Sequence, residues 1–158
     1  PSGKHAYAFN AHLPSGPNQA YQLLGLKGGY RTYPKIDTEE EAIAGAKKAR
    51  GKYIDRLLKL MKSFVDSEDP IFVVGDFNEP SHLDWTEAAA KAGHHPMKVA
   101  FPTSQRMVEA GFTDSYRTIF KSNFIEVFIE AFCACIKLKA LVVSISVYKI
   151  TDDLTIDI

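Results

Sequence analysis

Chemically capable side chains follow a short apolar run near the middle of the chain. Ile71 to Val74 are all apolar, which predicts a buried strand, and Gly75 ends the run. Asp76 and Asn78 follow two residues apart, so they point to the same side if the extended conformation persists. A carboxylate can bind Mg²⁺ or orient a water, and an amide can donate to a phosphoryl oxygen. The sequence therefore predicts a cation and phosphate site at the end of this strand.

A histidine near the start of the chain is the second candidate. His5 to Leu13 predicts a strand, and the sequence Pro-Ser-Gly-Pro that follows it predicts a break. Asn10 and His12 share one face of that strand. His12 and Asp76 fit water-activated phosphoester hydrolysis, in which the Asp orients or deprotonates water and the His stabilises a phosphate oxygen. Both also have an ordinary structural interpretation, because Asp and Asn favour turns and a single His in a strand is often structural.

The elements around these residues predict a layered α/β arrangement. Asn18 to Asp37 is rich in Gly and Tyr and predicts a long surface loop. Thr38 to Asp66 predicts a long helix, with Thr38 as N-cap and Glu41 closing a capping box. Its apolar stripe consists of Ile43, Ala46, Tyr53, Leu57, Leu58, Met61, Phe64 and Val65. The order strand, helix, strand favours a long helix packed on a mixed sheet.

Two short helices are expected after the second strand. One runs from Leu83 to Ala92 and ends at Gly93, and the other runs from Ser104 to Ala110 with Ser104 as N-cap. Beyond residue 120 the sequence changes character, and Phe124 to Ile136 predicts a helix while Leu141 to Tyr148 predicts a strand. The chain therefore divides into residues 1–120 and a tail of residues 121–158, whose last eight residues are too short to place.

The overall composition restricts the classes of molecule that the chain is expected to bind. The 158 residues carry 19 basic and 19 acidic side chains, so the totals give no long-range attraction to nucleic acid. A small phosphoester or a phospholipid headgroup is favoured over DNA as substrate. Charged residues at positions 126, 130, 137 and 139 interrupt the longest apolar stretch, which excludes a transmembrane span there. Cys133 and Cys135 predict two buried free thiols. The sequence does not indicate a cellular compartment.

Two segments resemble a known family. Val73 to Pro80 (VVGDFNEP) resembles the GDFN signature of the endonuclease/exonuclease/phosphatase superfamily, the DNase I-like metal-dependent phosphoesterases. Phe9 to Leu13 (FNAHL) looks like the upstream strand that carries the catalytic His of that family. Glu79 to Thr86 and Gly111 to Arg117 are similar to further segments of it. The resemblance covers about residues 1–120 and implies part of a four-layer α/β sandwich.

The resemblance also implies roles for single residues. Asp76 would orient the nucleophilic water and bind Mg²⁺ or Mn²⁺, Asn78 would hold the scissile phosphate, and His12 would neutralise a phosphate oxygen. Further substrate contacts are implied for Asn10, Ser81, His82 and Arg117. Two alternatives stay open: Arg117 as a surface ion-pair partner, and Asp114 as a residue that only holds its loop together. The pair His94-His95 is expected in a solvated turn.

The chain departs from the family pattern at both ends. The family has earlier strands that supply an Asn and a metal-binding Glu, and a later Asp-His pair, and neither is found in this sequence. We therefore expect weak or absent phosphoesterase activity in this chain. The alternative is a non-catalytic fragment that associates through an exposed apolar sheet face and its tail.

Overall fold

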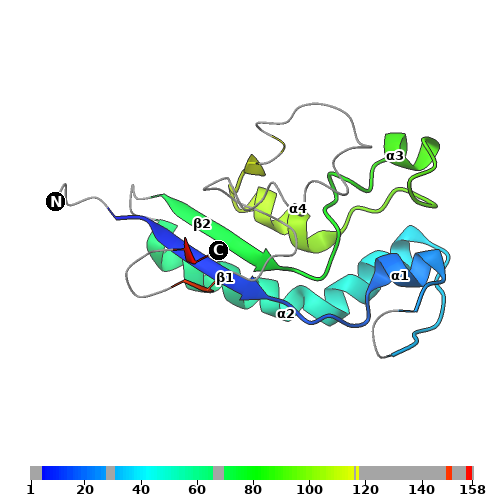
Figure 1. Ribbon diagram of the computed structural model, residues 1–158, viewed down its shortest axis with the longest axis horizontal. Helices are drawn as coiled ribbons and strands as arrows, with labels where there is room; N and C mark the ends of the chain where they lie inside the picture. Colours follow the sequence, from blue (N-terminus) through cyan, green and yellow to red (C-terminus); the bar gives the residue numbers. More distant parts are fainter. Residues whose placement is uncertain are drawn as a thin grey trace.

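Two parallel strands connected through one long helix form the frame of the computed structural model (Figure 1). The structure describes residues 5–27, 31–65, 70–115, 117, 149–150 and 156–157. The elements in chain order are β1 (Tyr7–His12), α1 (Gln19–Leu24), α2 (Glu39–Val65), β2 (Ile71–Asp76), α3 (Glu87–Lys91), α4 (Pro102–Glu109), β3 (Lys149–Ile150) and β4 (Ile156–Asp157).

The strands β1 and β2 confirm the two strand predictions. Their register begins with Tyr7 beside Ile71 and ends with His12 beside Asp76, so both candidate catalytic residues lie at the carboxyl end of the pair. The short strands β3 and β4 form a separate antiparallel pair. The predicted helix and strand at residues 124–148, and the two cysteines, lie outside the described residues.

Helix α2 packs along one face of the strands and runs in the opposite direction, as Figure 1 shows. The rings of Tyr7 and Phe9, at the start of β1, contact Phe64 near the end of α2, with centroid distances of 4.7 Å and 5.4 Å. The buried residues of this first cluster are Ala11, Leu13, Ile54, Met61, Val73, Phe77 and Met107. Alternate residues of both strands thus face the helix, which confirms the predicted packing of helix on sheet.

A second apolar cluster forms around the N-terminal half of α2. It combines α1 with the segment that precedes α4, and its buried residues are Ala20, Leu23, Ala42, Ala46, Trp85, Val99 and Phe101. Helix α2 therefore packs against both hydrophobic clusters. The residue between them on the buried face is Arg50, whose side chain is fully buried.

The capping box of α2 is confirmed. The Glu41 N–H donates to Thr38 Oγ1 over 3.1 Å, and the Thr38 N–H donates to the Glu41 carboxylate over 3.2 Å. Tyr53 was wrongly placed in the buried stripe, because its side chain is 40% exposed. The stripe instead includes Ile54, one residue further along, which is 1% exposed.

The predicted loop from Asn18 to Asp37 was wrong in its first third, where α1 forms. Asn18 is the N-cap of α1, and its Oδ1 accepts the Tyr21 N–H over 3.3 Å. Gly25 ends the helix in the left-handed conformation with φ 65°. Both are ordinary helix-boundary residues, and the helix between them is only six residues long.

The two later helices are shorter or shifted relative to the predictions. Helix α3 starts only after Thr86, whose hydroxyl accepts the Ala89 N–H over 3.2 Å, because a turn occupies the residues before it. Helix α4 begins at Pro102, so the assignment of Ser104 as N-cap was wrong. Proline suits the first helical position because it has no N–H to satisfy there.

The described part of the chain is mixed α and β, and none of its helices is long and apolar enough to cross a membrane. The opposite face of the strands carries the exposed Asn10 and His12 together with the half-buried Phe72 and Val74. Self-association through an apolar sheet face therefore stays a prediction.

Candidate functional site

His12 and Asp76 lie side by side at the carboxyl ends of β1 and β2. They are partners in the strand register, and His12 Nε2 lies 3.8 Å from Asp76 Oδ2. The His12 side chain is 68% exposed, whereas the Asp76 side chain is 19% exposed. Asn10 is exposed on the same face of β1 as His12. A ligand can therefore reach the imidazole from solvent and meet the carboxylate beside it.

Asn78 does not continue the extended strand, so the condition under which Asn78 and Asp76 were expected to point to the same side is not met. Its φ is 51°, in the left-handed region that Asn tolerates better than most residues. Its N–H donates to Asp76 Oδ1 over 2.8 Å, which closes a tight turn around the carboxylate. The turn fixes the Asp76 side chain in place.

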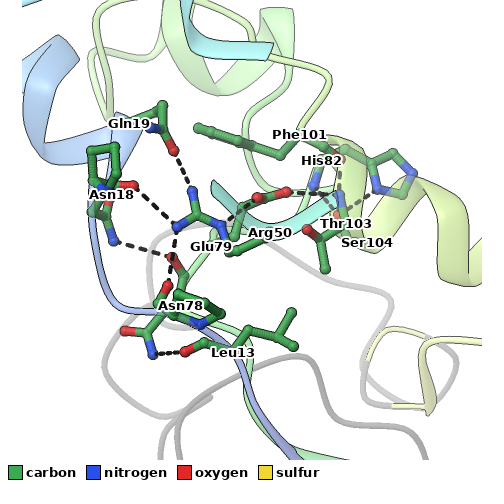
Figure 2. Close-up of polar contacts among 12 residues, drawn as sticks. Leu13, Asn18, Gln19, Arg50, Asn78, Glu79, His82, Phe101, Thr103 and Ser104 are labelled. Carbon is green, nitrogen blue, oxygen red and sulfur yellow. Dashed lines mark hydrogen bonds and ion pairs between the residues drawn. The ribbon is translucent and has the colours of Figure 1, made fainter. Parts of the chain in front are cut away.

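The Asn78 amide also joins the two strand ends. Its Nδ2 donates to the Leu13 carbonyl over 2.9 Å, directly after His12 (Figure 2). The Asn78 carbonyl in turn accepts from Asn18 Nδ2 over 3.3 Å, at the start of α1. One of the two amide hydrogens is thus used structurally, and a contact of Asn78 with a phosphate stays a prediction. The observed role is to hold β1 and β2 in register at the site.

A buried ion pair that was not predicted lies beneath this turn. Arg50 Nε donates to Glu79 Oε2 over 2.8 Å, and both side chains are 0% exposed (Figure 2). Arg50 also donates to the carbonyls of Pro14 and Pro17, over 3.3 Å and 3.1 Å, and to Gln19 Oε1. The second oxygen of Glu79 accepts the Thr103 N–H over 2.7 Å.

This network joins the loops that leave both strands. The carbonyls of Pro14 and Pro17 belong to the loop after His12, and Glu79 belongs to the turn after Asp76. Its signal in the sequence is the spacing of Ala42, Ala46, Arg50 and Ile54, which places an arginine on the apolar face of α2. A buried arginine requires a carboxylate partner.

Ser81 and His82 belong to the turn after the motif. The Ser81 hydroxyl is buried and accepts the Leu83 N–H over 3.2 Å. The His82 N–H donates to Ser104 Oγ over 2.8 Å, and His82 Nδ1 lies 2.9 Å from the same oxygen (Figure 2). Substrate contacts for Ser81 and His82 stay predictions, whereas their hydrogen bonds within the turn are observed.

Arg117 lies between two carboxylates. It forms ion pairs with Asp84 and Asp114, so the ion-pair alternative for this residue is observed. Burial alone would lower the pKa of Arg117, but the two carboxylates outweigh it and raise the pKa above its ordinary value. Asp114 also accepts the Arg117 N–H over 3.0 Å, which holds the local turn. Substrate binding by Arg117 stays a prediction.

The two adjacent histidines differ. His94 is exposed, as expected of a solvated turn. His95 is half-buried and stacks on Trp85, with ring centroids 4.4 Å apart and an interplanar angle of 6°, so its placement in a solvated turn was wrong.

His82 should make the stability depend on pH. Burial and then the charge of Arg117 lower its pKa below 6.5, and Glu109, Asp114 and Asp84 only partly oppose them. The unfolded chain therefore takes up a proton first as the pH falls. We expect the free energy of unfolding to decrease as the pH drops below about 6.5, until the lowered pKa of the folded state is passed.

Urea denaturation at pH 7.5, 6.5 and 5.5 checks this dependence. His82→Asn keeps a polar atom near the position of Nδ1 but does not titrate. As the pH drops, its free energy of unfolding should therefore decrease less than that of the parent chain. His94→Asn is the matched control, because His94 is exposed. Equal slopes for His82→Asn and the parent chain would contradict the assignment.

Within the described ranges, no group of three or more His, Cys, Asp or Glu side chains is arranged to hold a metal ion. Asp76 supplies one carboxylate, and one of its oxygens already accepts the Asn78 N–H. Mg²⁺ requires six oxygen ligands in near-octahedral geometry. The described residues therefore do not fit a complete Mg²⁺ site.

Comparison with known proteins gives a match over part of the chain. The chain is 39% identical over 89 residues to an uncharacterized protein of Caenorhabditis elegans, a match that covers 54% of this chain and 28% of that protein. The chain thus spans little more than a quarter of the length of this relative. No protein-family model and no solved structure matches the present chain.

Proposed function

We propose that this chain carries part of a phosphoester hydrolase centre, in which Asp76 activates the attacking water and His12 stabilises a phosphate oxygen. The observation that supports this proposal is the pairing of an exposed imidazole and a fixed carboxylate, 3.8 Å apart, at the carboxyl ends of two parallel strands. Loops at this end of parallel strands are the usual place for binding sites in α/β proteins.

The proposed step needs a water, a phosphoester and these two side chains. The Asp76 carboxylate accepts a proton from the water as the water oxygen bonds to phosphorus. The bond to the ester oxygen breaks, and this oxygen takes a proton from solvent. His12 donates a hydrogen bond to a non-bridging phosphate oxygen and offsets the charge that develops there. Asn78 positions Asp76 through its N–H and positions the end of β1 through its amide.

The proposed cofactor is Mg²⁺ or Mn²⁺, with Asp76 as its ligand among the described residues and with water and phosphate oxygens as further ligands. A divalent cation would stabilise the negative charge of the phosphoryl group. The proposed substrate is a small phosphoester or a phospholipid headgroup, because the chain has no net positive charge to attract nucleic acid. The four-layer sandwich remains part of the same proposal, since the described residues form one helix-covered face of a two-stranded sheet.

Replacement of Asp76 by Asn tests the mechanism. Asparagine keeps the shape of the side chain but cannot accept the proton, so the turnover rate should fall by about 10²- to 10⁴-fold. The assay is hydrolysis of bis(p-nitrophenyl) phosphate and p-nitrophenyl phosphate by the full 158-residue chain. It is run with Mg²⁺, with Mn²⁺ and with EDTA, and a phospholipid and an oligonucleotide are compared as alternative substrates.

Asp37→Asn is the matched control, because Asp37 is exposed and its ion pair with Lys35 lies on the surface. It should leave the rate unchanged. Equal rates for Asp76→Asn and the parent chain would remove Asp76 from the mechanism. If the parent chain itself shows no turnover with any substrate or metal, the non-catalytic alternative holds for this chain.

A further inference from the structure

The outward face of α2 carries a concentrated positive charge. Within residues 47–62 six basic side chains are exposed, and we call them the basic stripe: Lys47, Lys48, Lys52, Arg56, Lys59 and Lys62. On a helix with about 100° per residue they cover roughly half of the circumference. Five of them lie away from the buried Arg50 and Ile54, and Lys47, seven residues before Ile54, lies at the edge of the stripe. The stripe is about 22 Å long at a rise of 1.5 Å per residue.

The charge of the stripe is not neutralised by the described residues. The one acidic residue among positions 47–62 is Asp55, which pairs with Arg106 of α4. None of the six basic residues forms an ion pair within the described ranges. Three glutamates occupy the first turn of the same helix, outside the stripe. A chain of zero net charge thus presents a strongly positive local surface.

Two large apolar side chains border the stripe. Tyr53 is 40% exposed and Leu60 is 56% exposed, and their spacing of seven residues puts them on the same side of α2. Arg56 lies between them along that side. The Lys52 ammonium sits over the Tyr53 ring, 4.9 Å from its centroid. The surface therefore combines cations with an aromatic and an aliphatic side chain that are both open to solvent.

We infer that the basic stripe binds α2 to the surface of an anionic phospholipid bilayer. Lys and Arg near such a surface are attracted to its negative headgroups, and exposed Tyr and Leu side chains at the border can enter the boundary between headgroups and acyl chains. Five of the six cations are lysines, whereas specific contacts to nucleic acid phosphates and bases favour the bidentate geometry of arginine.

This inference does not depend on the proposed hydrolase function. The stripe lies on the outer face of α2, and the proposed reaction uses residues at the ends of β1 and β2. Vesicle binding can therefore be measured on a chain that shows no turnover, and turnover can be measured without vesicles.

Co-sedimentation with vesicles tests the inference. The 158-residue chain is mixed with vesicles of phosphatidylcholine alone and with vesicles that contain about 30% phosphatidylserine, each at about 0.05 M and about 0.5 M salt. We expect binding to the phosphatidylserine vesicles at low salt and its loss at high salt, because salt screens the attraction. Each neutralised lysine should weaken binding about fivefold, so Lys48→Gln/Lys52→Gln/Lys59→Gln should weaken it roughly 100-fold.

The matched control neutralises three exposed lysines outside the stripe, as Lys27→Gln/Lys35→Gln/Lys98→Gln. It has the same net charge as the stripe variant and should keep most of the affinity. Tyr53→Ser/Leu60→Ser should weaken binding to the phosphatidylserine vesicles severalfold at the low salt concentration. Circular dichroism verifies that each variant keeps its helices.

Three results would overturn the inference. The parent chain could stay in the supernatant with phosphatidylserine vesicles, or the control variant could lose as much affinity as the stripe variant. The third result is tighter binding to a DNA or RNA of about 30 nucleotides at the same salt concentration, measured by fluorescence anisotropy, with the same loss in the stripe variant. That outcome would assign the stripe to nucleic acid.

Discussion

Gly75→Ala is expected to destabilise the chain by more than about 3 kcal/mol and to separate the carboxyl ends of β1 and β2. A Cβ atom at position 75 would lie 2.0 Å from the backbone oxygen of Ala11, its partner in the register. The φ of Gly75 is also +130°, a conformation that residues with a side chain rarely adopt. The clash involves backbone, so no rotamer change can relieve it.

Variants of two other glycines separate the cost of the steric clash from the cost of the positive φ. Gly93 has a φ of +82° with open space where a Cβ atom would lie, so Gly93→Ala should cost only about 1 kcal/mol. Gly51 lies inside α2 with nothing nearby, and Gly51→Ala should stabilise the chain by about 0.5–1 kcal/mol. Urea denaturation of the three variants measures these values. A loss at Gly75 no larger than the loss at Gly93 would show that β1 and β2 do not pair as described.

Arg50→Met is expected to destabilise the chain by about 3–5 kcal/mol, because it leaves the Glu79 carboxylate buried without its partner. The carbonyls of Pro14 and Pro17 lose their donors at the same time. Arg50→Lys keeps the charge but has a single nitrogen, which cannot serve all of these acceptors. We expect it to fall between the parent chain and Arg50→Met, as measured by thermal or urea denaturation.

Arg106→Met is the matched control for this prediction. Removal of the Arg106 guanidinium also leaves a carboxylate, that of Asp55, without a partner. The Arg106 and Asp55 side chains, however, are partly or largely exposed. The cost should stay below about 1 kcal/mol. The double variant Arg50→Met/Glu79→Leu should recover part of the loss, because no buried charge remains. Additive losses in the double variant would contradict a direct coupling between Arg50 and Glu79.

Local patterns in the sequence were sufficient for the elements that carry the site. The apolar run before Gly75 predicted β2, and the pair Thr38 and Glu41 predicted the start of α2. Helix α1 was missed because its six residues are too few to show a helical period, although Asn18 and Gly25 bound it correctly.

The contacts that fix the site depend on long-range structure and were not predictable in the same way. Asn78 could either extend the strand or turn, and its bond to the Leu13 carbonyl, 65 residues away in sequence, accompanies the turn. Arg50 was not among the predicted site residues. Its burial depends on the carboxylate of Glu79 and on two carbonyls of another loop, none of which is visible in the helical period.

The parallel pairing of β1 and β2 also sets an order of events during synthesis. His12 leaves the ribosome long before Asp76, and at about 5–20 residues per second β1 waits roughly 3–13 s for its partner strand. During that interval Phe9, Ala11 and Leu13 have no strand beside them, while α2 can already form from local contacts. A nascent chain that stops before β2 thus offers an unpaired apolar strand, the kind of segment that chaperones recognise and that aggregates when they are absent.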